Sequence, residues 1–116
     1  MRKLPVIGAA IAFSFAAAGT ALAAETTVTG NLRDAYCYIR MGAHGPSHKS
    51  CAIKCAKAGI PVLLVTESGK TYTLLPPKDE HPYPDSVIQH MEDKVTVTGH
   101  EYAKDGQNFL TVDSLK

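Results

Sequence analysis

The chain has 116 residues, a formal net charge of +1 at pH 7 and 45% hydrophobic residues, which suits one small domain with a modest core. The net charge falls to −1 when Arg2 and Lys3 are left out. A chain this close to neutral lacks the clustered positive charge that phosphate binding needs, so we expect no nucleic-acid partner.

The first residues predict export. Arg2 and Lys3 precede an almost wholly apolar run over residues 4–18, and Ala21-Leu22-Ala23 fits a small-residue cleavage site. The run is too short to span a bilayer, and no second apolar segment follows it. We therefore expect residues 1–23 to be a cleaved signal peptide. Residues 24–116 then form one soluble domain without a membrane span, in the periplasm or outside the cell.

The first half of the mature chain predicts a strand, a loop, a helix and a hairpin. Alternating residues favour a strand over 26–32, and the glycine-containing segment 33–46 reads as a loop. Ser47 as an N-cap and Gly59 as a C′ residue bracket a helix over 47–58. The apolar run 62–65 and the segment 71–75 form the two arms of a hairpin around a glycine-containing turn.

The second half predicts a proline-rich surface loop up to Pro84, a short helix capped by Asp85 or Ser86, and strands over 95–99 and 109–115. The result is a mainly β chain with five strands, a helix between strands 1 and 2, and a short helix between strands 3 and 4. This order is typical of a small OB-like Greek-key barrel, whose closure leaves no exposed sheet edges.

A cysteine and histidine cluster is the most informative feature of the chain. His48, Cys51 and Cys55 fall on one face of the expected helix, and a chain reversal can bring Cys37 over them. Thiolates and imidazole are good ligands for zinc and copper, so these four residues predict a metal site. Two neighbours in the loop are further candidate ligands, Met41 and His44.

Other interpretations of the cysteines stay open. Cys37 can instead form a disulfide with Cys51 or Cys55, which closes a loop of about fifteen residues and stabilises by roughly 3 kcal/mol. Thiol redox catalysis is disfavoured because the chain lacks a Cys-x-x-Cys pair, so we expect a binding protein rather than an enzyme. A non-covalent haem with His48 as an axial ligand also stays open.

Three further residues near the cluster are candidates. Asp34 caps the turn after the first strand, or orients His48 by a hydrogen bond from outside the ligand set. Tyr36 and Tyr38 flank Cys37 and are candidates for a binding face, since aromatic rings on OB barrels stack ligands.

The motifs also carry a resemblance. The chain resembles a group of small exported bacterial proteins in three successive motifs: Gly30-x-Leu32-x-Asp34-x-x-Cys37, His48-x-x-Cys51-x-x-x-Cys55-x-x-x-Gly59-x-Pro61 and Val95-x-Val97-Thr98-Gly99. The resemblance covers nearly the whole mature chain. It implies a signal peptide followed by one OB-like barrel, and it implies no activity.

Two hypotheses from different classes follow. In the first, an exported binding protein holds copper or zinc at the cysteine and histidine cluster, for metal handling or to support its own structure. In the second, a disulfide-stapled barrel binds another periplasmic component without a metal.

Overall fold

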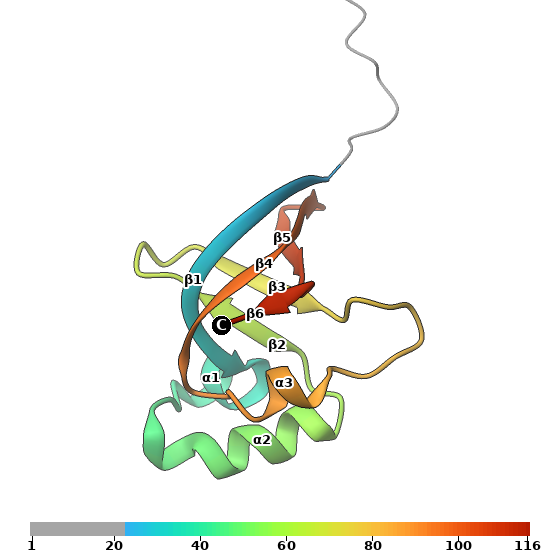
Figure 1. The fold of residues 1–116 in the computed structure, drawn as a ribbon. Coiled ribbons are helices and arrows are strands. Elements are labelled where there is room, and N and C mark those ends of the chain that lie inside the picture. Colours follow the sequence, from blue (N-terminus) through green and yellow to red (C-terminus); the bar gives the residue numbers. More distant parts are fainter. Residues whose placement is uncertain (1–22) are drawn as a thin grey trace, which may run out of the picture.

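The computed structural model describes residues 23–116, which form a closed five-stranded barrel with short helices (Figure 1). The predicted signal peptide lies outside the described residues, apart from Ala23 at their boundary. The strands are β1 (Ala24–Asp34), β2 (Val62–Val65), β3 (Thr71–Leu75), β4 (Lys94–Lys104), β5 (Gln107–Thr111) and the two-residue β6 (Ser114–Leu115). The strand order β1-β2-β3-β5-β4 is closed by pairing of β1 with β4, with β3 and β5 parallel. The predicted OB-like barrel is confirmed.

β1 pairs first with β4 and then with β2, and a glycine allows this change of partner strand. Its first part, Ala24 to Asn31, pairs with β4, and its last part, Asn31 to Asp34, pairs with β2. At Gly30, where the change occurs, an added Cβ would lie 2.6 Å from the carbonyl oxygen of Val65. The bend therefore requires a residue without a side chain.

The helices differ from the prediction in three ways. The expected loop over 33–46 contains a seven-residue helix, α1 (Ala35–Met41). The single helix expected over 47–58 is a 3-10 turn (Pro46–His48) followed by α2 (Lys49–Lys57). Ser47 is not its N-cap, because the turn begins after Gly45 without a side-chain cap. Gly59 follows α2 with φ +91°, as predicted for a C′ residue.

The remaining differences are small. The short helix α3 (Asp85–Ile88) lies between β3 and β4 as predicted, but Pro84 precedes it in place of an Asp or Ser cap. The strand expected over 109–115 is interrupted, because the chain leaves β5 after Thr111 and pairs again with β4 as β6. The backbone of Asp113 donates to Thr98 at this crossing, 3.0 Å away.

The core fills the barrel and extends under the helices. Its completely buried large side chains come from strands, α3 and the start of the segment after it: Leu32, Val62, Leu64, Leu74, Val87, Met91, Val97 and Leu110. Ala52 and Ala56 place one face of α2 against this core. All three helices gather at the end of the barrel where β1 finishes (Figure 1). Among residues 23–116, no helix is long and apolar enough to cross a bilayer.

Candidate metal centre

Asp34, the last residue of β1, begins the candidate site. Its side chain is completely buried, and its Oδ2 accepts a hydrogen bond from the backbone N–H of Cys37, 2.9 Å away. This is the N-cap of α1, with Asp34 in an extended conformation. The backbone N–H of Ala35 donates to the carbonyl of Pro61 at 2.9 Å, which fixes the start of α1 beside β2.

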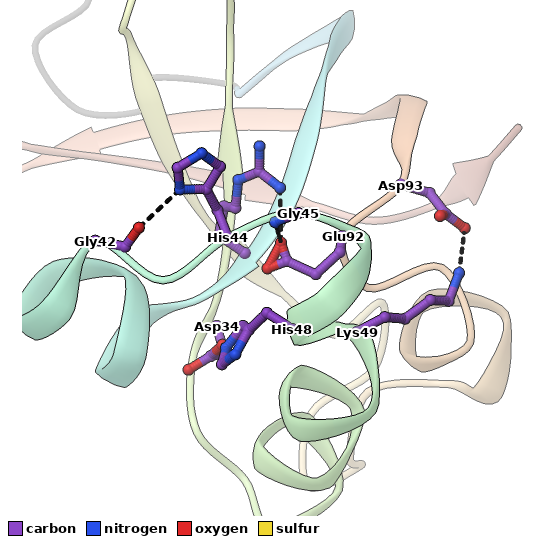
Figure 2. Close-up of polar contacts among 9 residues, drawn as sticks. Asp34, Gly42, His44, Gly45, His48, Lys49, Glu92 and Asp93 are labelled. Carbon is purple, nitrogen blue, oxygen red and sulfur yellow. Dashed lines mark hydrogen bonds and ion pairs between the residues drawn. The ribbon is translucent and has the colours of Figure 1, made fainter.

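The other carboxylate oxygen of Asp34 faces His48. The distance between Oδ1 and His48 Nε2 is 2.7 Å, and Figure 2 shows the two side chains together. Burial opposes ionisation of Asp34, but the hydrogen bonds from Cys37 and His48 outweigh it and lower its pKa. Since an ionised carboxylate only accepts, Nε2 carries the proton and donates. In the neutral ring, Nδ1 is then the nitrogen with a free lone pair.

α1 and α2 bring the three cysteines together. One sulfur from each of Cys37, Cys51 and Cys55 lies within 4.8 Å of the other two, and we call this set the thiol cluster. All three are free thiols, so the predicted disulfide is wrong for this structure. The sulfurs meet because Asp34 begins a helix that places Cys37 opposite α2, whereas the sequence analysis expected a loop there.

The environment of the thiol cluster keeps its inner thiols protonated. Burial, the Asp34 carboxylate and the neighbouring thiols raise the pKa of Cys37 to about 12. Burial, followed by Asp34 and Cys51, also raises the pKa of Cys55. Both are therefore poor nucleophiles without a cation beside them, because the thiolate is the reactive form.

The donor set fits a soft metal ion. A metal–sulfur bond of about 2.3 Å holds three sulfurs about 4 Å apart around one ion, so sulfurs already within 4.8 Å need only small side-chain rotations. A second group, Asp34, Cys37 and His48, also lies within 4.8 Å and shares Cys37 with the thiol cluster. The four predicted ligands thus form two overlapping groups instead of one stripe.

Comparison with family models, with curated proteins and with solved structures finds no match. What the site does is therefore argued from its own geometry and chemistry.

The remaining predicted residues belong to neither group. His44 Nδ1 lies 2.7 Å from the carbonyl oxygen of Gly42, and its ring meets Tyr38 edge-on at 6.4 Å between centroids. Met41, at the end of α1, is 67% exposed. Tyr36 stacks under Arg40, whose guanidinium carbon lies 4.8 Å from the ring centroid. Two positions apart on a helix, Tyr36 and Tyr38 point to different sides of α1.

A buried ion pair supports the segment that carries His48, and the sequence analysis missed it. Glu92 Oε2 lies 2.6 Å from Arg33 Nη1, with the Glu92 side chain 0% and the Arg33 side chain 12% exposed. The same oxygen accepts the backbone N–H of Gly45 at 3.3 Å, just before the 3-10 turn (Figure 2). Glu92 holds this position with φ +69°, a left-handed conformation that costs a non-glycine residue about 1 kcal/mol or more.

The next residue, Asp93, supports the other side of the same turn. Its Oδ2 lies 2.8 Å from Lys49 Nζ at the start of α2, and this pairing is the main cause that lowers the Asp93 pKa. His48 therefore lies between Gly45, which Glu92 binds, and Lys49, which Asp93 binds. The ion pair of Arg33 with Glu92 joins residues 59 positions apart, and no local pattern signals it.

Proposed function

We propose that this protein is an exported binding protein that holds one copper or zinc ion at the thiol cluster, with His48 and Asp34 beside it. Its role would be metal handling or metal-supported structure. The observation that carries the proposal is the convergence of three sulfur atoms from α1 and α2 to within 4.8 Å of one another. Thiolate-rich sites favour copper(I) and zinc over harder cations.

The geometry supports a division of roles. Cys37, Cys51 and Cys55 supply soft ligands, and His48 lies in a second group that shares Cys37 with them. Asp34 already uses one oxygen for the Cys37 backbone and one for His48. We therefore assign it the task of orienting these two residues, which is the usual role of a carboxylate hydrogen-bonded to a ligating histidine.

Export is part of the proposal and rests on the sequence. The basic start, the apolar run and the Ala21-Leu22-Ala23 site precede a strand that begins at Ala24. The resemblance to small exported bacterial proteins points the same way. A periplasmic or secreted site for copper or zinc would meet ions that enter from outside the cell.

The test is elemental analysis with thiol titration on protein recovered anaerobically from its own host. We expect about one equivalent of copper or zinc, with thiols that react far more slowly while the metal is bound than after it is removed. Cys55→Ser should lower metal content and affinity strongly, whereas Ser50→Ala, an exposed change on the same helix, should leave both unchanged. Metal-free protein that binds neither added Cu(I) nor added Zn²⁺ would contradict the proposal.

A further inference from the structure

The three thiols differ in how far solvent reaches them. Cys37 is 7% exposed, Cys55 is partly buried, and Cys51 is exposed. α2 rests on the core through Ala52 and Ala56, so Cys51 can move without opening the core. Of the three ligands, it is therefore the one that can leave a bound ion at the lowest cost in packing.

The charged residues of the segment that carries this exposed thiol are all cationic, although the whole chain is near neutral. No aspartate or glutamate occurs between positions 35 and 66, where four cationic residues lie, Arg40, Lys49, Lys54 and Lys57. We call the part of it that holds the helices, residues 35–58, the helical cap. All eleven acidic residues of the chain lie outside it. Glu92 and Asp93 contact it from another part of the chain, at Gly45 and Lys49.

Two of these cations are available to an incoming ligand. Lys49 is paired with Asp93 at 2.8 Å, and Arg40 stacks on Tyr36. Lys54 and Lys57 are exposed and form none of the ion pairs found in residues 23–116. Three residues after Cys51, Lys54 lies about 60° from it around α2. A free ammonium group therefore lies on the surface next to the exposed thiol.

We propose that Cys51 is the position at which the bound ion is handed over, and that the acceptor is an anionic thiol. This inference rests on the proposed function. The acceptor thiol loses its proton to water, and its thiolate forms a bond to the ion. The bond between the ion and Cys51 Sγ then breaks, and Cys51 takes up a proton. The ion keeps its oxidation state, and further acceptor thiolates displace Cys55 and Cys37 in the same way.

The charge of the helical cap favours such an acceptor for two reasons. A positive surface raises the local concentration of anionic partners and their rate of association. Nearby lysines also stabilise the thiolate form that attacks the ion. Cys37 and Cys55 meanwhile hold the ion from the inner side, so it is never released to solvent during the exchange.

The experiment compares two dithiol acceptors that differ in charge, dimercaptosuccinate (anionic) and dithiothreitol (neutral). The full chain is expressed, purified and loaded with Cu(I) under anaerobic conditions. Loss of the ultraviolet thiolate-to-Cu(I) absorption is followed by stopped flow. We expect a rate that rises linearly with acceptor concentration and is about tenfold higher for dimercaptosuccinate at low salt. The difference should shrink as the salt concentration rises.

Two variants locate the effect. Lys54→Glu should remove most of the preference for dimercaptosuccinate. Lys116→Glu, a matched charge change at an exposed residue outside the helical cap, should keep it. Limited alkylation of the Cu(I)-loaded protein with iodoacetamide, read by mass spectrometry, should label Cys51 first.

The outcomes separate this inference from the proposed function. A chain that takes up neither Cu(I) nor Zn²⁺ contradicts both. Tight binding with a transfer rate independent of acceptor concentration overturns the hand-over through Cys51 and leaves the metal site intact. First labelling of Cys37 or Cys55 would also overturn the hand-over through Cys51 and leave the metal site intact. Equal transfer rates to the two acceptors at low salt would overturn the proposal that the acceptor is anionic.

Discussion

Replacing Glu92 with alanine tests the support beneath the site, because it removes one partner of a buried ion pair. The Glu92 side chain is 0% and the Arg33 side chain 12% exposed, so the guanidinium would stay buried without its carboxylate. Such a loss costs about 3–5 kcal/mol. The backbone N–H of Gly45 also loses its acceptor. Against a total stability of about 5–15 kcal/mol, we expect Glu92→Ala to unfold far more easily than the parent chain.

The backbone conformation provides a matched second variant. Alanine keeps the left-handed strain of position 92 (φ +69°), whereas glycine adopts this conformation freely. Both variants lose the carboxylate equally. Glu92→Gly should therefore be more stable than Glu92→Ala by about 1 kcal/mol.

Urea unfolding of the metal-free protein, followed by far-ultraviolet circular dichroism, measures all three proteins. The chain has no tryptophan, which makes this signal more suitable than fluorescence. A Glu92→Ala chain within 1 kcal/mol of the parent would refute the assigned cost of the unpaired arginine. If Glu92→Gly were the less stable of the two variants, the strain at position 92 would not exist.

Four further predictions follow from the fold and the site. Gly99→Ala should prevent folding, seen as a lost strand signal in circular dichroism, because a Cβ there would lie 1.6 Å from the carbonyl oxygen of Thr111; neighbouring Thr98→Ala should fold. Because the Asp34 pKa is lowered, its contribution is present above the unfolded value of about 4 and is lost as pH falls below it. Acid titration of Asp34→Asn should therefore show a weaker loss of stability as the pH falls below about 4. The Cys37 pKa is raised to about 12 in the folded protein, so the contribution of this thiol to the free energy of unfolding is present below the unfolded pKa of about 8.5 and is lost as pH rises through the folded pKa. In urea unfolding at alkaline pH, Cys37→Ser should therefore lose less stability than the parent chain. Competition with a chelator should show metal affinity rising about tenfold per pH unit for each thiol proton displaced, and Cys37→Ser should lower that slope by one proton.

The barrel could be predicted from the sequence because its signals are local. Alternation in segments such as 95–99 and glycine or proline at the turns give the strand order, and that order limits the fold to few topologies. The helix α1 could not be predicted as readily, because Tyr36, Cys37 and Tyr38 have no strong helical preference and Gly42 reads as a loop residue. The one available signal was an Asp N-cap followed by a glycine that ends the helix, at Asp34 and Gly42.

The sequence singled out the residues that the structure gathers in the candidate site, but it indicated only part of their arrangement. The spacing of Cys51 and Cys55 on one helix places their sulfurs on one side, and this pattern is visible in the sequence. The position of Cys37 depends on α1, and the position of His48 depends on the 3-10 turn held by Glu92. Both are tertiary effects, so periodicity alone could not place the four residues relative to one another.

Asp34 explains why the thiol cluster is suited to a cation. Burial is the main cause of the raised Cys37 pKa, and the negative charge of Asp34 adds to it by opposing formation of a thiolate. The same charge attracts a metal ion that binds beside it, and a bound cation reverses the local preference for the protonated thiol. Burial and this carboxylate therefore keep Cys37 protonated in the metal-free protein, and a cation bound beside both groups would favour the thiolate.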